Sequence, residues 1–234
     1  NKIYVLNPDW TIRSGWPKTT SFEIDSSPAI GDINGDGNLD IVVGSKWNSI
    51  IDVFDKNGNI LKEINASAQQ YTEGSSIIVS SLVIGDVNGD LKPDILQAPT
   101  SNNQIYAWNC DGTIINDWPK DFTNFGDLGP VDTPIIEDIN NDGYVDIILG
   151  TRQGIVYIWD QPNYYYPQKM DWPTYQHDVK NTGVYKRLKC GDANGDSKTN
   201  LGDIIYLVNY LFKGGPYPIG NSDVNGNIQV TLSD

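Results

Sequence analysis

The sequence predicts a mainly β protein: an incomplete β-propeller-like array of repeats over residues 1–185, followed by a small α-helical module over residues 186–234. Three observations support this fold class. One segment of 18 residues recurs three times without gaps, and a second, shorter segment recurs four times. A helical period of apolar residues is found only after residue 200.

The longer repeat places a polar loop between two apolar runs. Its copies are SPAIGDINGDGNLDIVVG at 27–44, SLVIGDVNGDLKPDILQA at 81–98 and TPIIEDINNDGYVDIILG at 133–150. The first loop aspartates, Asp32, Asp86 and Asp138, are 54 and 52 residues apart. Because the flanking runs are rich in Ile and Val, we expect a strand, a loop and a second strand in each copy.

The shorter repeat reads as a further strand that ends in a turn. Its copies are KIYVLN at 2–7, IIDVFD at 50–55, QIYAWN at 104–109 and IVYIWD at 155–160, and turn residues such as Asn57-Gly58 follow them. Trp-Pro pairs begin at Trp16, Trp118 and Trp172. Short strands with a period of about 50 residues are typical of propeller blades, and the copies amount to about 3.5 blades.

Each loop of the longer repeat has oxygen-bearing side chains at alternate positions, which suits calcium. Calcium takes six to eight oxygen ligands, including carboxylates and backbone carbonyls. We predict side-chain ligands at loop positions 1, 3, 5 and 9 and a backbone carbonyl at position 7. These residues are Asp32, Asn34, Asp36, Asn38 and Asp40; Asp86, Asn88, Asp90, Lys92 and Asp94; and Asp138, Asn140, Asp142, Tyr144 and Asp146.

The alternative is that these loops are turns that bind nothing, since Asp, Asn and Gly favour turns in any case. Three carboxylates gathered in each of three matching loops would repel one another without a cation. Magnesium suits the loops less, because it prefers a smaller octahedral shell and keeps its water. We therefore favour calcium.

The repeated D-x-N-x-D-G-x-x-D core resembles the FG-GAP/VCBS repeat family, whose calcium-loop blades are also found in integrin α-subunits. The resemblance implies a propeller-type arrangement of sheets and calcium at the residues named above. It implies little about activity, because family members serve in adhesion, in ligand binding and as appendages of extracellular enzymes. Two positions depart from the pattern: Leu91 replaces a glycine, and Glu137 replaces the glycine that precedes the first aspartate of the other loops.

A different loop opens the C-terminal module. It has EF-hand spacing, with an Asp at the twelfth position where Glu is usual, and its predicted ligands are Asp192, Asn194, Asp196, the carbonyl of Lys198, Asn200 and Asp203. Apolar residues follow at helical spacing from Ile204 to Phe212, and glycines at 214–215 should end that helix. A fourth blade loop is the alternative, because Asp192 lies 54 residues after Asp138.

This segment looks like a dockerin repeat, a loop–helix calcium module that normally comes as a pair. The resemblance implies a second, poorer loop, whose ligands are Asp223, Asn225, Asn227, the carbonyl of Gln229, Thr231 and Asp234. We expect the second repeat to be truncated at that loop. The positions that match the cohesin contacts of dockerins, Leu201-Gly202 and Leu232-Ser233, do not form a recognisable cellulosomal signature.

Composition excludes several classes of function. A formal net charge of −14 argues against nucleic acid and anionic membrane as partners, and no run of 18 apolar residues could span a membrane. The single histidine, His177, is expected in a surface loop, and no catalytic arrangement is visible, so we predict no enzyme. Whether Cys110 and Cys190 form a disulfide is left open.

We therefore expect a secreted, calcium-binding structural or adhesive protein whose partners are other copies of itself or another extracellular protein. Four copies of the shorter repeat against three of the longer one favour head-to-tail self-assembly. The main alternative is a carbohydrate-binding or cohesin-docking accessory module of a secreted polysaccharide-degrading enzyme. A propeller-fold polysaccharide lyase is a weaker one. The best candidate for an exposed aromatic contact is the Tyr164-Tyr165-Tyr166 run.

Overall fold

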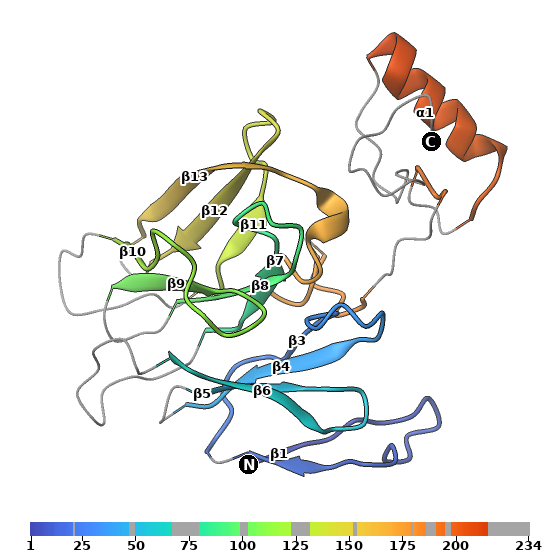
Figure 1. The fold of residues 1–234 in the computed structure, drawn as a ribbon. Coiled ribbons are helices and arrows are strands. Elements are labelled where there is room, and N and C mark those ends of the chain that lie inside the picture. The colour runs from blue at the N-terminus through green and yellow to red at the C-terminus, as the bar shows by residue number, and fades with distance from the viewer. Residues whose placement is uncertain are drawn as a thin grey trace. The chain divides into compact units, whose positions relative to one another are not determined.

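The computed structural model is mainly β, as predicted, with antiparallel strands in four sheets and one α-helix among the residues it describes (Figure 1). Those residues are 1–20, 22–46, 50–66, 80–98, 103–122, 132–151, 154–178, 180–185, 191–194 and 198–214. They belong to two compact units, one of residues 1–165 and 169–184 and one of residues 166–168 and 185–234. Within the described ranges no helix has the length and apolar character needed to cross a membrane.

The first unit contains a hairpin and three repeat sheets. The N-terminal hairpin, residues 1–20, pairs β1 (Lys2–Ile3) with β2 (Lys18–Thr19). Repeat 1 is β3 (Ala29–Gly31), β4 (Asp40–Gly44), β5 (Ile50–Phe54) and β6 (Ile60–Asn65) in that spatial order. Repeat 2 is β7 (Val83–Gly85), β8 (Asp94–Gln97), β9 (Gln104–Trp108) and β10 (Lys120–Asp121). Repeat 3 is β11 (Ile135–Glu137), β12 (Tyr144–Gly150) and β13 (Val156–Tyr164).

The predicted strand–loop–strand unit is confirmed in all three repeats, with one common register. Residues at the same repeat position pair in each sheet, as in Ala29↔Val42, Val83↔Leu96 and Ile135↔Ile148. The shorter sequence repeat supplies β5, β9 and β13, which pair with the strand after the loop. Because the pairing is antiparallel and the loops are short, both ends of each loop are held by a strand.

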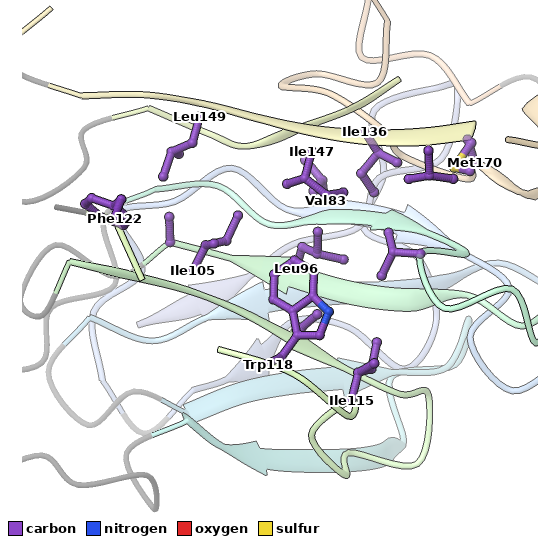
Figure 2. Packing of buried hydrophobic residues seen from close by; sticks show 14 residues of the cluster. Val83, Leu96, Ile105, Ile115, Trp118, Phe122, Ile136, Ile147, Leu149 and Met170 are labelled. Carbon is purple, nitrogen blue, oxygen red and sulfur yellow. The ribbon is translucent and has the colours of Figure 1, made fainter. Parts of the chain in front are cut away.

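A large apolar cluster lies between repeats 2 and 3. Figure 2 shows side chains from β7, β8 and β9, such as Val83, Leu96 and Ile105, facing Ile136 and Ile147 of β11 and β12. All five side chains are completely buried. Burying apolar area on this scale is the main favourable contribution to folding, so the sheets are held face to face by packing.

Several tryptophans pack inside the repeats, although Trp159 is only half-buried. Trp118 belongs to the cluster between repeats 2 and 3, and Trp108 and Trp172 are buried as well. Trp16 fills the corresponding place in the N-terminal hairpin, where its ring lies 5.9 Å from that of Phe54 in repeat 1. Its indole also donates a hydrogen bond to the carbonyl of Lys56 at 3.3 Å. Burial of these rings leaves them unavailable for stacking on a ligand.

Consecutive repeats are also joined by a recurring hydrogen bond. The amide of Ser27 donates to the hydroxyl of Ser81 at 3.0 Å, and the amide of Ser81 donates to the hydroxyl of Thr133 at 3.3 Å. These residues open the three copies of the longer sequence repeat. The hydroxyl that begins the second and third copies therefore joins each of them to the preceding repeat.

A short segment after the 3₁₀ turn η2 (Pro167–Lys169) hydrogen-bonds to the first strands of the repeats. We call Lys169–Thr174 the central segment. Trp172 exchanges two backbone hydrogen bonds with Ile84 of β7, at 2.8 and 2.9 Å, and the carbonyl of Pro173 accepts from Ile136 of β11 at 2.9 Å. A single extended segment thus satisfies backbone groups of two different sheets.

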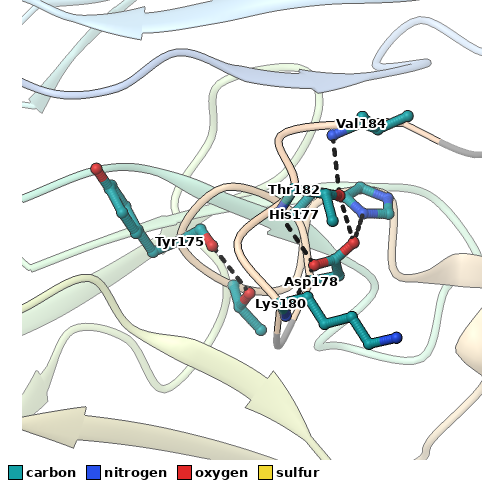
Figure 3. A network of polar contacts seen from close by, with 7 residues as sticks. Tyr175, His177, Asp178, Lys180, Thr182 and Val184 are labelled. Carbon is teal, nitrogen blue, oxygen red and sulfur yellow. Dashed lines mark hydrogen bonds and ion pairs between the residues drawn. The ribbon is translucent and has the colours of Figure 1, made fainter.

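The turn after the central segment is stabilised by Asp178 (Figure 3). Its carboxylate accepts from the amide of Lys180 at 2.9 Å and from the amide and hydroxyl of Thr182 at 3.2 and 2.5 Å. These bonds, the Thr182 hydroxyl first, lower the pKa of Asp178. His177 lies in this turn, as expected, but its side chain is only 16% exposed and its ring packs edge-on against Trp172 at 5.1 Å.

The described part of the second unit is dominated by the predicted helix, α1 (Leu201–Lys213). Asn200 caps its N-terminus by accepting a hydrogen bond from the amide of Gly202, and Gly214 ends it in the left-handed conformation at φ 65°. In the first unit, Cys110 is a free thiol. Cys190 lies outside the described residues.

Candidate metal-binding loops

The loops of repeats 1, 2 and 3 close with the same hydrogen bonds from backbone to side chain. The carboxylate at position 1 accepts from the backbone amide at position 6. These bonds run from Gly37 to Asp32 (2.8 Å), from Leu91 to Asp86 (2.9 Å) and from Gly143 to Asp138 (2.9 Å). At position 3 they are Asp36 to Asn34 (2.9 Å), Asp90 to Asn88 (2.8 Å) and Asp142 to Asn140 (2.9 Å). At position 5 they are Asn38 to Asp36 (2.7 Å), Lys92 to Asp90 (2.9 Å) and Tyr144 to Asp142 (2.9 Å). The predicted ligand positions are therefore structurally equivalent in the three repeats.

The aspartate at position 9 is buried in every loop. Asp40 is 1% exposed, and Asp94 and Asp146 are 0% exposed. One oxygen of each accepts a hydrogen bond from the amide of loop residue 2, at 3.1, 3.0 and 3.0 Å respectively. Burial raises the pKa of Asp40 to about 6 and that of Asp94 to about 8, and it also raises the pKa of Asp146. An ionised carboxylate at these places needs a compensating positive charge.

Buried carboxylate oxygens in loops 1 and 3 have no hydrogen-bond partner. They are one oxygen of Asp40, one of Asp32 and one of Asp146, and the carboxyl group of Asp146 also lies beside that of Asp160. Leaving such an acceptor buried and unsatisfied costs on the order of 1–3 kcal/mol, and more when it is charged. A hard divalent cation would supply the missing partner through bonds that these oxygens favour. The chemistry of the donor set thus fits calcium.

In loop 2 the position-9 aspartate, Asp94, has an additional hydrogen-bond donor. The side-chain amide of Asn88 donates to Asp94 at 3.3 Å and to the side-chain oxygen of Asn109 at 2.9 Å. Loop 2 also has Leu91 at the position of Gly37 and Gly143, with a left-handed φ of 69° that favours glycine. Leu91 adopts this left-handed conformation, and in it the backbone amide of Leu91 donates to the carboxylate of Asp86.

Within the described part of the chain, no three acidic, histidine or cysteine side chains already converge as a metal cluster. In loop 3, for example, the side-chain amide of Asn140 donates to one carboxylate oxygen of Asp142 at 2.9 Å. A bound ion would have to displace that amide from the carboxylate. At position 7 of loop 1, the side-chain oxygen of Asn38 accepts from Lys56 at 2.7 Å, so only its backbone carbonyl is left for an ion.

The central segment anchors the start of loops 1 and 2. The amide of Asp32 donates to the carboxylate of Asp171 at 2.9 Å, and the amide of Asp86 donates to the carbonyl of Lys169 at 3.1 Å. The glycine before each of these aspartates permits the approach, since a Cβ at Gly31 would lie 2.9 Å from an oxygen of Asp171. Asp171 is therefore a positioning residue that the sequence analysis missed.

Glu137, which replaces that glycine in the third repeat, takes a different role. Its carboxylate accepts from the amide of Asp138 at 3.3 Å, so loop 3 supplies its own anchor. It also hydrogen-bonds to Tyr165, and burial together with Glu137 raises the pKa of that phenol. The first aspartate of loop 3 is therefore anchored by its neighbour Glu137, and the central segment bonds to this repeat at Ile136 instead.

The loop of the second unit holds its twelfth-position aspartate through hydrogen bonds from backbone amides. Asp203 is buried and accepts from the amides of Asn200 at 2.7 Å and Asn194 at 3.3 Å. These bonds, that of Asn200 first, lower the pKa of Asp203. Asp192 is buried as well. The other predicted ligands of this module that can be placed are Asn194, Lys198 and Asn200, whereas Asp196, Asp223, Asn225, Asn227, Gln229, Thr231 and Asp234 lie outside the described residues.

Residues 32–97 and 86–149 match the FG-GAP-like repeat family. Each match begins at the first aspartate of a loop and ends in the strand after the next loop. Together they cover half of the chain, which therefore belongs to the family of proteins with FG-GAP-like repeats. No curated protein sequence matches it.

Two solved structures are similar to parts of the chain. The crystal structure of the V. cholerae biofilm matrix protein Bap1 matches with 24% identity and a TM-score of 0.37, over 57% of this chain and 19% of that chain. A crystal structure of BBS1N in complex with ARL6DN, soaked with lead, matches with 11% identity and a TM-score of 0.45, over 70% of this chain and 51% of that chain. The chain thus spans only part of either neighbour, and TM-scores this low do not establish a common fold.

Proposed function

We propose that the chain is a calcium-binding extracellular protein with a structural or adhesive role, in which each FG-GAP-like repeat holds one calcium ion. The observation that carries this proposal is the buried position-9 aspartate with an unpartnered oxygen in loops 1 and 3. Calcium would neutralise these carboxylates and join the two strands that flank each loop. The protein's own residues position the ligands: the loop amides orient the carboxylates, and Asp171 holds the start of loop 1.

Several finer features belong to the same proposal. The repeats form an incomplete propeller-like array, and the C-terminal loop and helix form a dockerin-like calcium module. The chain acts outside the cell, where millimolar calcium would fill sites of modest affinity. It is not an enzyme, and its partners are other copies of itself or another extracellular protein.

Thermal unfolding in calcium and in EGTA tests the proposal. A ligand that binds only the native state stabilises it by about 2.7 kcal/mol per site at a hundredfold excess over Kd. Asp94→Asn preserves the shape of the buried side chain but removes its charge, so it should lose the calcium-dependent stabilisation of loop 2 and change stability little in EGTA. Asp117→Asn is the matched control, because Asp117 is exposed and lies outside the loops. Unfolding curves that coincide with and without calcium would refute the proposal.

Carbohydrate binding is a second candidate, favoured by one observation. A hollow of about 530 Å³ beside loop 2 is lined by polar side chains that suit sugar hydroxyls, among them Asn88, Asn109, Asn116, Gln161 and Asn163. The tryptophan of the hollow, Trp118, is buried and offers little ring face for stacking. Glycan-array binding that is lost in Asn116→Ala would support this candidate.

A further inference from the structure

Each repeat has two apolar faces, and equivalent side chains make up the same face in every repeat. We call the face that includes β-strand positions 83, 96, 105 and 107 of repeat 2 the forward face, and the opposite one the rear face. The forward face is Ala29, Ile33, Val42, Ile51 and Val53 in repeat 1; Val83, Val87, Leu96, Ile105 and Ala107 in repeat 2; and Ile135, Ile139, Ile148, Val156 and Ile158 in repeat 3.

The forward face is buried in repeats 1 and 2 but largely exposed in repeat 3, where Ile148 alone is half-buried. Every forward-face residue of the first two repeats is between 0% and 3% exposed. In repeat 3, Ile139 is 52% exposed, Val156 63% and Ile158 49%. A row of large apolar side chains left in water on one sheet face is typical of an interaction surface.

The structure shows what covers a forward face. That of repeat 2 packs against the rear face of repeat 3, formed by Ile136 and Ile147 with the rings of Tyr157 and Trp159. The partner of a forward face is therefore the rear face of a following repeat, with its aromatic third strand.

The N-terminal hairpin presents an exposed rear face. Its segment KIYVLN aligns with the third strands of the repeats, so Tyr4 and Leu6 occupy the positions of Tyr157 and Trp159. Tyr4 is 55% exposed and Leu6 44% exposed. Their neighbours Ile3 and Val5 point the other way and pack against repeat 1. The array thus has an exposed rear face at one end and an exposed forward face at the other.

Trp10 adds a second, independent observation at the hairpin. It is 82% exposed and has a φ of 65°, at the turn position where repeats 1 and 2 have Gly58 and Gly112. A left-handed conformation costs a residue other than glycine on the order of 1–2 kcal/mol. An exposed indole held in an unfavourable backbone conformation suggests a role in contact with a partner.

The repeats indicate where that indole would lie. The equivalent turn of repeat 2 crosses the outer strand of repeat 1, since a Cβ at Gly112 would be 2.8 Å from Lys62 and 3.2 Å from Ile64. Lys62 pairs with Val53, which has the repeat position of Ile158. Placed in the same way against repeat 3, Trp10 would lie beside Ile158 at the outer edge of β13.

Charge and shape agree with this placement. Residues 1–20 carry Lys2, Arg13 and Lys18 against the single acidic Asp9, although the whole chain is strongly acidic. Beside the forward face of repeat 3 is a hollow of about 710 Å³, lined in part by Ile135, Asp132 and Glu137 and by Tyr175 of the turn in Figure 3. A basic hairpin and an acidic, apolar hollow attract each other.

We infer that a second copy of this chain docks its N-terminal hairpin, through Tyr4, Leu6 and Trp10, onto the forward face of repeat 3. The contact is head to tail, so copies join into an open filament or a closed ring. The inference rests on the structural role proposed above, but the contact is made by apolar side chains and does not require a calcium ligand.

Sedimentation of the full chain over about 5–200 μM, in calcium, tests the inference. The wild type should self-associate, and Ile158→Glu and Leu6→Glu should each weaken association at least tenfold. An equimolar mixture of the two variants should form dimers and nothing larger, because one sound interface remains between them. Ile60→Glu is the matched control, since Ile60 is 55% exposed on β6 and belongs to neither proposed face, and it should associate like the wild type.

Trp10→Gly separates assembly from folding. It relieves the backbone strain, so this variant should unfold at a slightly higher urea concentration than the wild type while associating more weakly. A wild type that stays monomeric at about 200 μM overturns the inference, and so does a variant mixture that stays monomeric. Either result, obtained together with a calcium-dependent shift in unfolding, would leave the proposed calcium function standing. Self-association without any effect of calcium on unfolding would support this inference and refute the proposed calcium function.

Discussion

The carboxylate of Asp171 accepts a hydrogen bond from the amide of Asp32 at 2.9 Å, across 139 residues of sequence. The first residue of loop 1 is therefore positioned by the central segment, which follows the last repeat. The stability of the first repeat should depend on a residue that belongs to none of its strands.

Asp171→Asn should lower the free energy of unfolding by about 1 kcal/mol, because a hydrogen bond to a charged acceptor contributes more than one to a neutral amide. Urea unfolding in EGTA measures the change. Asp117→Asn makes the same substitution before another Trp-Pro pair and should stay within about 0.5 kcal/mol of the wild type. Equal effects of the two substitutions would contradict the anchoring role.

Leu91→Gly and Gly143→Leu should change stability in opposite directions. Both residues occupy the same loop position with φ of 69° and 86°, and a Cβ at Gly143 would meet no atom within 4 Å. The substitutions therefore differ mainly in how well each residue tolerates the left-handed backbone conformation. Gly143→Leu should lower the free energy of unfolding by about 1–2 kcal/mol, and Leu91→Gly should raise it by up to about 1 kcal/mol. Thermal unfolding of the two variants checks this, and a loss of stability in both would contradict it.

Asp52 should make the protein less stable as the pH rises from about 4 to 6. It is buried in β5, and burial, followed by repulsion from Glu63 on β6, raises its pKa to about 6. Because the folded state binds this proton more tightly than the unfolded state, its contribution is most favourable below pH 4 and declines until the carboxyl is ionised in both states.

Asp52→Asn should therefore gain stability relative to the wild type at pH 7, on the order of 2 kcal/mol, and show little gain at pH 4. Urea unfolding at both pH values in EGTA measures the difference. Glu63→Gln is the control, and it should reproduce only a small part of the gain. A pH-independent difference between wild type and Asp52→Asn would contradict the prediction.

Asn200 combines the helix cap of α1 with a predicted calcium ligand, and two substitutions separate these roles. Asn200→Ala removes the acceptor for the amide of Gly202 and should cost about 1 kcal/mol of helix stability. Asn200→Asp keeps the cap and adds a ligand charge, so it should retain the helix and tighten calcium binding. Far-UV circular dichroism and calcium titration of the full chain measure the two effects. Weaker calcium binding by Asn200→Asp would count against the ligand role.

The strands and their register were predictable because they depend on local pattern. Apolar runs on both sides of each loop recur at the same spacing, so the pairing of Ala29 with Val42 recurs as that of Val83 with Leu96. The helix was predictable for the same reason, since its apolar spacing and Gly214 lie next to each other in sequence. The loop hydrogen bonds also follow local rules, because Asx side chains bond to amides two residues on.

Contacts between distant segments could not be predicted in this way. Nothing near Asp171 indicates Asp32 as its partner, and nothing near His177 shows that its ring meets the buried Trp172. The substitution of Glu137 for glycine was visible in the sequence, but its reason, the contact with Tyr165, depends on how β11 packs. A glycine before two of the loop aspartates was the one signal that another segment comes close.

The hydroxyls of Ser81 and Thr133 give the array a direction. Each accepts a hydrogen bond from the amide that opens the repeat before it, so donor and acceptor lie at matching positions one period apart. A gene that duplicates or deletes a whole period would therefore recreate the junction without a new mutation at either side. Change in array length is then a tolerated event in evolution, whereas a shift of even one residue within a period would separate every such pair downstream.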